Sequence, residues 1–458
     1  MKNKSSLLLS TTMLVSLLAG CTGNQPQPTA APTPGSAPTT PTASATTPAV
    51  TAPAAQTSTT TTPTKAGKTT VQFWHSLGGK NGEYMDALIK RFNESHQDIE
   101  VVGNFQGSYD ETVTKLQQAI ASKTAPDVSM LERAYVELFA DADVLEDLNP
   151  LLKTSGLSAD GFTAGLMGHS TFNNKLVALP LNRSTPILHI NKTMLDELGL
   201  AVPSTWEELN KAANALVVKE NGEVKRYGVT MPYDTWYPIA LLSQAGGKFF
   251  SDDKKTIGFY DNGVGAKAFN YLKDLQNTGA LYYPPAQDSG NITSKMFVDG
   301  KVGIMYGSTG SIGGLASTVS FNYVTAFLPK DKVIATPTGG ANVALLSSSP
   351  NKAAAWEFVR WMETDPQGAL PFILQSGYLP FTKAMVESKE MKELWAKEPN
   401  RKVAYDQLQY AVDTNKDVAW PEIMHEFFSA IEAIMYDSKN VQTTLDTFKK
   451  EAERILNQ

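Results

Sequence analysis

The chain has 458 residues and a formal net charge of −6, with 40 Lys and Arg against 46 Asp and Glu. Apolar residues make up 42% and charged residues 19%, which is typical of a soluble globular protein, and the acidic balance disfavours nucleic-acid binding. A single cysteine excludes a disulfide framework and a zinc site of several thiolates, and the five histidines do not pair at helical spacing.

The first twenty residues have the composition of a secretory signal peptide. Two lysines precede a mostly apolar stretch from Leu7 to Leu18, which is too short to span a membrane. The next residues, Leu18-Ala19-Gly20-Cys21, resemble a bacterial lipobox, in which the cysteine becomes the lipidated N-terminus. We therefore predict a signal peptide over residues 1–20 and lipidation of Cys21. The alternative is a secreted protein in which this cysteine has no role.

Residues 21–67 differ in composition from the rest of the chain. They consist mainly of Thr, Ala and Pro, and Lys65 is the only charged residue among them. Such a segment cannot bury enough apolar surface to offset its chain entropy, so we predict a disordered tether. Its prolines favour extended conformations, and it would hold a folded body away from the membrane.

Residues 68–458 are predicted to form an α/β body. Segments rich in β-branched and aromatic residues, at 71–74, 99–105 and 128–131, alternate with segments whose apolar residues recur at helical spacing. Strands and helices that alternate in this way form right-handed βαβ units. We therefore expect helices against the faces of a mostly parallel sheet.

The alternation continues downstream, less regularly. Thr205 followed by Glu208 predicts a capping box at the start of a helix. A further helix is expected over residues 353–362, and the last forty residues have helical periodicity. Four more segments are strand-like: 176–181, 187–190, 302–306 and 342–346. No repeat of fixed period is present, which disfavours a solenoid or a propeller.

Motifs of the common enzyme classes are missing from the sequence. It contains no nucleophile elbow, no P-loop, no HExxH pair and no glycine-rich dinucleotide fingerprint after a strand. A glycosidase would need paired carboxylates, and four acidic residues could supply them: Glu132, Glu137, Asp141 and Asp143. Carboxylates on solvated helix surfaces are common, so we favour that interpretation and expect no catalytic residue.

Seven stretches of the body resemble the family 1 extracellular solute-binding proteins of ABC importers. They occur in the family's order and cover nearly the whole body: 73–76, 124–128, 184–192, 203–209, 297–305, 339–342 and 377–380. The resemblance implies a two-lobed clamshell like that of periplasmic binding proteins, with discontinuous lobes. Lobe 1 would comprise residues 68–184 and 333–378, and lobe 2 residues 185–332 and 379–458.

Within that family the chain is most similar to the glycerol-3-phosphate-binding branch. The similarity places the ligand contacts of the branch on ten residues: Tyr109, Glu132, Arg133, Ser184, Tyr233, Trp236, Ser308, Gly340, Tyr378 and Lys416. The branch's glutamate falls on Arg133, with Glu132 just before it, and its phosphate-binding arginine falls on Lys416. Hydroxyls, a glycine amide and an ammonium suit a small anionic or polyhydroxylated solute.

The resemblance implies capture of a solute without chemistry. We expect glycerol-3-phosphate or a glycerophosphodiester to bind between hinged lobes and to pass to the permease subunits of an ABC importer. The alternatives are a neutral sugar or oligosaccharide as the solute, a sensor lipoprotein with the same clamshell, or an extracellular glycosidase. We expect a monomer without cofactor or metal that binds no nucleic acid. It would be lipid-anchored to the cell membrane, facing the periplasm or the cell exterior.

Overall fold

The computed structural model describes residues 67–458, which belong to one compact unit. The predicted signal peptide, the predicted lipidation site at Cys21 and nearly all of the predicted tether lie outside the described residues. No helix in the described part of the chain is both long and apolar enough to cross a membrane.

The first sheet has five strands in the order β2-β1-β3-β14-β6. Its strands are β1 (Thr69–His75), β2 (Ile99–Phe105), β3 (Val128–Glu132), β6 (Leu179–Pro180) and β14 (Ala341–Leu345). The three strands predicted first in the chain pair in parallel, as expected, whereas β14 runs antiparallel to both β3 and β6. The predicted α/β class is confirmed, but the sheet is mixed rather than mostly parallel. The strand β14 joins it after the chain has returned from the second sheet, so no helical crossover from β3 sets its direction.

The second sheet is built in the same way. Its strands, in the order β10-β9-β11-β7-β12, are β7 (Pro186–Asn191), β9 (Glu223–Thr230), β10 (Leu281–Tyr282), β11 (Val302–Ser308) and β12 (Tyr323–Ala326). The strand β9 is parallel to β10 and β11, while β7 is antiparallel to β11 and β12. Three further pairings are short, and they involve β8 (Val218–Glu220) with β9, β4 (Thr171–Phe172) with β5 (Lys175–Leu176), and β13 (Thr336–Pro337) with β15 (Ala411–Val412).

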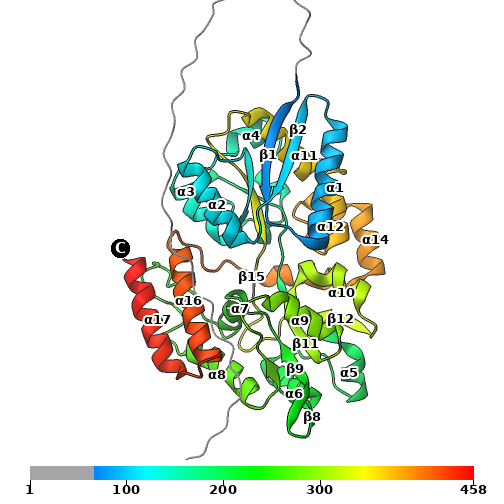
Figure 1. The fold of residues 1–458 in the computed structure, drawn as a ribbon, viewed down its shortest axis with the longest axis vertical. Coiled ribbons are helices and arrows are strands. Elements are labelled where there is room, and N and C mark those ends of the chain that lie inside the picture. The colour runs from blue at the N-terminus through cyan, green and yellow to red at the C-terminus, as the bar shows by residue number, and fades with distance from the viewer. Residues whose placement is uncertain (1–66) are drawn as a thin grey trace, which may run out of the picture. The chain divides into compact units, whose positions relative to one another are not determined.

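Helices flank both sheets (Figure 1). Those grouped with the first sheet are α1 (Gly79–Ser95), α2 (Tyr109–Ala121), α3 (Val136–Asp141), α4 (Asn149–Thr154), α11 (Lys352–Thr364), α12 (Leu370–Ser376), α13 (Lys383–Glu387) and α14 (Lys389–Lys397). The helix α15 (Pro399–Gln407) contacts both, since Ala404 belongs to the first core and the Asn400 side chain donates to the Tyr323 carbonyl of β12 at 2.9 Å. Those grouped with the second sheet are α5 (Lys192–Glu197), α6 (Trp206–Leu216), α7 (Trp236–Gln244), α8 (Val264–Asn277), α9 (Ser289–Val298), α10 (Ile312–Thr318), α16 (Trp420–Met435) and α17 (Val441–Leu456). Half of the predicted capping box of α6 forms: the Thr205 hydroxyl accepts the Glu208 amide at 3.1 Å, but the Glu208 carboxylate accepts the Ser204 amide at 2.7 Å instead of the Thr205 amide.

Each sheet has its own large hydrophobic core, and the two cores divide the chain. The core of the second sheet takes in the terminal helices α16 and α17. The segment between α12 and α16 packs against the other sheet, since its residues Leu379, Phe381 and Met391 belong to the core of the first sheet. We therefore propose that the second lobe resumes near β15, later in the chain than the predicted residue 379.

Close pairing joins the segments that run between the sheets. Ser184 and Gly339 exchange two backbone hydrogen bonds of 3.1 and 2.7 Å, and β13 pairs in parallel with β15. Because these segments connect the two cores with few residues, we propose them as the hinge about which the lobes would move.

Candidate solute-binding site

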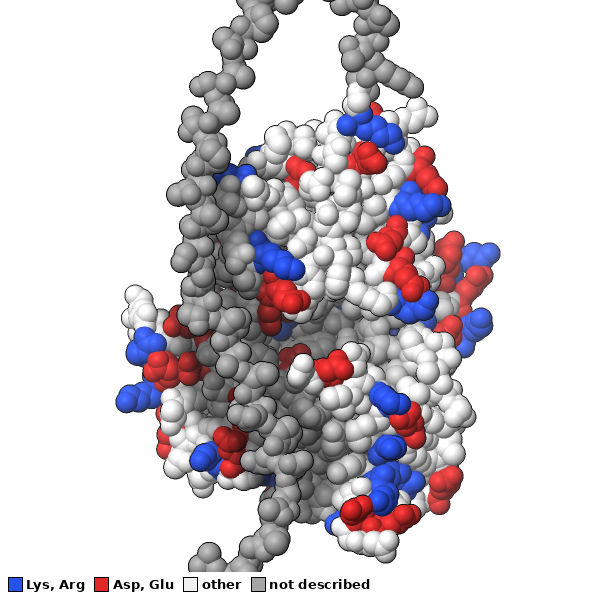
Figure 2. All heavy atoms as spheres, viewed as in Figure 1, with Lys and Arg blue, Asp and Glu red and all other residues white. Residues whose placement is uncertain are grey.

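A cavity of about 420 Å³ is lined by residues from the ends of both sheets. Figure 2 shows the surface hollowed between the two halves of the described body. Eight of the ten predicted contact residues line the cavity: Tyr109, Glu132, Arg133, Ser184, Trp236, Ser308, Gly340 and Tyr378. A cavity of this size is ordinary for a small-molecule site.

The first side of the cavity begins at the N-terminus of α2. The Ser108 hydroxyl accepts the Glu111 amide at 3.2 Å, and the Glu111 carboxylate accepts the Ser108 amide at 2.7 Å, so this helix start is fixed by a capping box. The next residue, Tyr109, accepts a 2.7 Å hydrogen bond from the Asn182 side chain. Burial raises the pKa of Tyr109 well above its usual value, so the phenol stays protonated.

Glu132 and Arg133 both line the cavity. The strand β3 ends at Glu132 and Arg133 begins a 3₁₀ turn, so the two side chains need not alternate between faces as they would within a strand. The Glu132 carboxylate accepts the Ala134 amide at 2.8 Å. Burial raises the pKa of Glu132, although the neighbouring Arg133 guanidinium opposes that shift.

Arg133 is fixed from behind the cavity. Its side chain is buried, with Nη1 2.7 Å from Nε2 of His169 and Nη2 donating to the Asn415 side chain at 3.2 Å. Its Nε lies 3.9 Å from the Glu132 carboxylate and has no hydrogen-bond partner among residues 67–458. A buried donor without a partner costs free energy, which an acceptor atom that reached it would recover.

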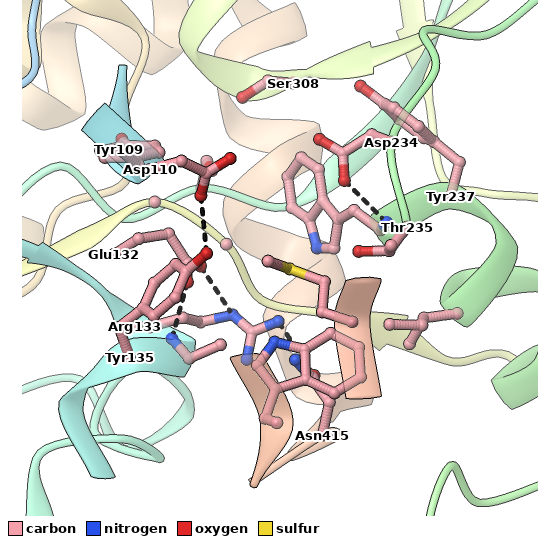
Figure 3. Close-up of a pocket in the computed structure, with 18 of the residues that line it drawn as sticks. Tyr109, Asp110, Glu132, Arg133, Tyr135, Asp234, Thr235, Tyr237, Ser308 and Asn415 are labelled. Carbon is pink, nitrogen blue, oxygen red and sulfur yellow. Dashed lines mark hydrogen bonds and ion pairs between the residues drawn. The ribbon is translucent and has the colours of Figure 1, made fainter. Parts of the chain in front are cut away.

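The second side of the cavity carries Asp234, Thr235, Trp236 and Tyr237 at the start of α7, with Ser308 at the end of β11 (Figure 3). The Asp234 carboxylate accepts the Trp236 amide at 2.9 Å, and the Trp236 indole donates to the Thr338 carbonyl at 3.1 Å. Burial raises the pKa of Asp234 to about 6, and the nearby carboxylates Glu132 and Asp110 add to this shift.

Gly340 has a conformation and an environment that exclude a side chain. Its φ is +78°, a region that residues with a Cβ rarely adopt, and a Cβ there would lie 2.0 Å from the Asn182 carbonyl oxygen. Glycine at this position therefore lets the start of β14 lie close to the backbone of Asn182. This is the physical reason for the glycine that the sequence comparison singled out.

Two predicted residues do not line the cavity. The Tyr233 hydroxyl donates to Glu432 at 2.8 Å, and its ring packs on Phe428, with 5.0 Å between ring centroids. Lys416 lines a neighbouring cavity of about 570 Å³ that shares Asn415 with the first. Its ammonium donates to the Gly168 carbonyl and lies 4.0 Å from Glu137. The cation on the wall is thus Arg133, which the resemblance had aligned with a glutamate.

Several lining residues were not predicted. They are Asp110, Tyr135, Asp234, Asn415 and three residues on one face of α16, namely Trp420, Met424 and Phe428. The Tyr135 hydroxyl donates to Asp110 at 2.7 Å (Figure 3). The spacing of four residues along α16 is the sequence signal that could have found its three side chains, because residues four apart share a helix face.

The lining is richer in negative than in positive groups. Among the described residues it contains the carboxylates Asp110, Glu132 and Asp234, and Arg133 as its cation. Carboxylates accept hydrogen bonds from polyol hydroxyls, a guanidinium binds an oxyanion, and indole faces cover C–H surface or a cation. No cluster of three or more metal-ligating side chains was found within residues 67–458. The arrangement suits binding of a small polar molecule.

Residues 87–400 match the family described as bacterial extracellular solute-binding proteins. The chain belongs to this family. Among curated relatives, the sn-glycerol-3-phosphate-binding periplasmic protein UgpB of Agrobacterium fabrum is 25% identical over 417 residues, covering 85% of this chain and 93% of that protein. UgpB of Rhizobium meliloti is 26% identical over 399 residues, covering 82% and 91%.

Solved structures of solute-binding proteins share the fold. UgpB from Mycobacterium tuberculosis, in complex with glycerophosphocholine, superimposes with a TM-score of 0.77 at 25% identity, covering 85% of this chain and 99% of that chain. The GacH receptor of Streptomyces glaucescens, solved with acarbose, gives 0.77 at 22% identity, covering 85% and 99%. The predicted family, two-lobed α/β fold and function as a solute-binding protein of an ABC importer are confirmed. The family is extracellular or periplasmic.

Proposed function

We propose that the protein captures a zwitterionic glycerophosphodiester, such as glycerophosphocholine, and delivers it to an ABC permease. Of the two predicted phosphorylated solutes, the charges of the cavity favour the diester. A phosphomonoester carries up to two negative charges and no positive one, and it would meet the carboxylates of Asp110, Glu132 and Asp234. This excess of carboxylates over the guanidinium of Arg133 is the observation that carries the proposal.

The first side of the cavity would hold the glycerol and phosphate groups. Glu132 and Asp110 offer acceptors for glycerol hydroxyls, and the Tyr109 hydroxyl adds a neutral donor. The Nε of Arg133 is a charged donor without a partner in the described body, so it suits a phosphate oxygen. The hydroxyls of Ser184 and Ser308 lie on the same cavity and would complete the oxygen contacts.

The second side would hold the cationic headgroup. Asp234 stands next to the indole of Trp236 in the chain, and both line the cavity with Phe428 and Trp420. Aromatic faces attract quaternary ammonium groups, and a carboxylate beside them adds Coulombic attraction. UgpB from Mycobacterium tuberculosis was solved in complex with glycerophosphocholine, which carries a phosphodiester and a quaternary ammonium group.

A neutral oligosaccharide is the second candidate. The cavity volume of about 420 Å³ equals the liquid volume of roughly fourteen water molecules, which is more than a glycerol phosphate fills. Carboxylates with aromatic faces also suit uncharged sugar rings, and this solute needs no cation in the cavity.

Titration calorimetry with glycerophosphocholine, glycerol-3-phosphate and maltotriose tests the proposal. We expect a Kd in the micromolar range or tighter for glycerophosphocholine, corresponding to about −8 kcal/mol, and at least tenfold weaker binding of the other two. Binding of maltotriose alone would establish the second candidate. Tighter binding of glycerol-3-phosphate than of the diester would contradict the charge argument.

We further propose that Cys21 carries lipid that anchors a monomer to the membrane beside its permease, with residues 22–67 as the link. A lipidated N-terminus would keep the protein near the transporter, because each buried methylene contributes about 0.8 kcal/mol to membrane binding. Incorporation of labelled palmitate into the wild type but not into Cys21→Ala supports this anchor, and equal incorporation contradicts it. No solute should be turned over, which chromatography of the recovered solute would check.

A further inference from the structure

A buried histidine that the proposed function does not use lies directly behind Arg133. His169 has no exposed surface, and its ring touches three charged side chains. Nε2 is 2.7 Å from Nη1 of Arg133 and 3.1 Å from the Asp413 carboxylate, while Nδ1 is 3.1 Å from the Glu137 carboxylate. Its backbone is fixed as well, since the Asn342 side chain donates to the His169 carbonyl at 3.0 Å.

The two neighbours of Nε2, Arg133 and Asp413, have opposite hydrogen-bonding requirements. A guanidinium only donates hydrogen bonds and a carboxylate only accepts them, so Nε2 bonds to one or the other according to whether it carries a proton. With the proton on Nδ1, that N–H donates to Glu137 and the lone pair of Nε2 accepts from Arg133. With a proton on Nε2, that N–H donates to Asp413 and also faces the N–H atoms of Arg133, which cannot accept it. The contact of 2.7 Å favours the first arrangement, because it is the shorter of the two.

Asp413 also has cationic neighbours other than His169. Burial opposes ionisation of Asp413, but its contacts with His169 first, and then with Lys416 and Arg133, hold the pKa of that carboxyl below its usual value. Lys416 lies 3.9 Å from Asp413 and 4.0 Å from Glu137, so both carboxylates have this ammonium nearby. With no proton on Nε2 of His169, Asp413 would therefore still lie near two cations, Lys416 and Arg133.

We propose that His169 is a positioning residue of the solute site, and that it aims the guanidinium of Arg133 at the bound anion. His169 holds Nη1 and Asn415 holds Nη2, which leaves Nε, buried 3.9 Å from the Glu132 carboxylate, as the guanidinium nitrogen without a partner among residues 67–458. A planar guanidinium held at two nitrogens cannot rotate without breaking one of these bonds. The inference rests on the proposed function, since it assigns the anionic group of the solute to Arg133.

Two replacements of His169 separate positioning from a merely structural role. His169→Gln keeps an acceptor oxygen for Arg133 and an N–H for a carboxylate, whereas His169→Leu provides neither. In calorimetry with glycerophosphocholine we expect His169→Leu to weaken binding about tenfold and His169→Gln to stay within threefold of the wild type. The matched control is His75→Leu, which removes another buried histidine, one that does not line the cavity, and should leave affinity unchanged. Equal affinity of the wild type and His169→Leu would overturn the inference.

A second measurement does not depend on the solute. Nitrogen-15 chemical shifts of the histidine rings distinguish a nitrogen that carries a proton from one that accepts a hydrogen bond. At pH 8 we expect the proton of His169 on Nδ1 and an acceptor-type Nε2. A proton on Nε2 would overturn the inference even if His169→Leu failed to fold. If the wild type bound no glycerophosphodiester, the proposed function would fail, and this measurement would still decide whether His169 holds Arg133.

Discussion

The two sides of the cavity are built on different principles. On the side of the first sheet, polar groups are tied to one another and to buried partners: Tyr135 to Asp110, Asn182 to Tyr109, and His169 to Arg133, each at 2.7 Å. On the side of the second sheet, the bond made by Asp234 is to the amide of Trp236, within its own helix start. The first side therefore presents polar atoms in a fixed geometry.

The second side contributes apolar faces and one carboxyl group whose charge changes near neutral pH. This group is Asp234, whose pKa is raised to about 6 by burial, and Trp236 and Phe428 add aromatic surface to the same cavity. From this difference we propose that the first side sets the orientation of the solute and that the second would cover it on lobe closure. The following predictions test this division from the largest expected effect to the smallest.

Replacement of Arg133 should have the largest effect on stability, because Arg133 contacts three polar side chains on the first side of the cavity. Arg133→Met leaves His169 and Asn415 without their partner and the Glu132 carboxylate without its nearby cation. We expect the free energy of unfolding to fall by about 3–5 kcal/mol, as is usual when one member of a buried charged group is removed. Urea denaturation measures this, with the exposed Arg454→Met as control. A loss below 1 kcal/mol would mean that the first side is not a coupled network.

Trp236→Ala tests the covering role of the second side. Loss of the indole removes aromatic surface that we assign to the solute, and we expect weaker binding of glycerophosphocholine by about 2 kcal/mol, or roughly thirtyfold. Stability should change less than for Arg133→Met. The half-buried Trp395→Ala, which does not line the cavity, is the matched control and should retain wild-type affinity by calorimetry. Equal losses in both variants would contradict the assignment.

The pH dependence of binding tests the charge on the second side. Because the pKa of Asp234 is about 6, the carboxyl is ionised above that pH and neutral below it. Affinity for a cationic headgroup should therefore fall about fivefold between pH 7.5 and 5, a range in which the phosphodiester keeps its charge. Asp234→Asn should remove this trend, as calorimetry at several pH values would show. A trend for glycerophosphocholine that persists in the variant would assign it to another group.

The same shift predicts how stability depends on pH. A carboxyl whose pKa is raised on folding binds its proton more tightly in the folded state than in the unfolded state, whose pKa is about 3.9. The contribution of Asp234 to stability is therefore full below about pH 4 and is lost as the pH rises through about 6. Asp234→Asn should flatten this part of the curve of melting temperature against pH. An unchanged curve would show that the carboxyl is not buried in this way.

The smallest effect is expected from Tyr233, which the resemblance placed in the site and the structure places outside the lining. Tyr233→Phe removes a hydroxyl bonded to the exposed Glu432, so affinity should stay within twofold. The matched variant Tyr109→Phe removes a hydroxyl on the cavity and should weaken binding about tenfold, since a net hydrogen bond contributes about 0.5–1.5 kcal/mol. Equal losses of affinity in the two variants would contradict the assignment of Tyr109 to the cavity lining and of Tyr233 to a position outside it.

The sequence predicted the local structure better than the long-range pairing. The alternation of apolar residues located β1, β2 and β3 and their parallel pairing, because this information lies within each segment. The direction of β14 depends on a strand more than two hundred residues earlier in the chain, and no local pattern records it. The return of the chain to the first sheet through Leu379 and Met391 was missed for the same reason.

The site shows the same limit. The resemblance named Gly340 and Tyr109, which line the cavity, and the steric need for glycine at 340 gives a physical reason for one of them. It also named Lys416, which lies in a loop and lines the neighbouring cavity instead. Asp110 and Asp234 could not be distinguished from solvated acidic residues without their neighbours in space.

A crystal structure of the protein with glycerophosphocholine tests the central claim most directly. We predict the phosphate within hydrogen-bond distance of the Arg133 guanidinium, and the ammonium group against the Trp236 indole and the Asp234 carboxylate. A solute held in the reverse orientation, or one bound in the neighbouring cavity beside Lys416 while this cavity holds only water, would contradict it.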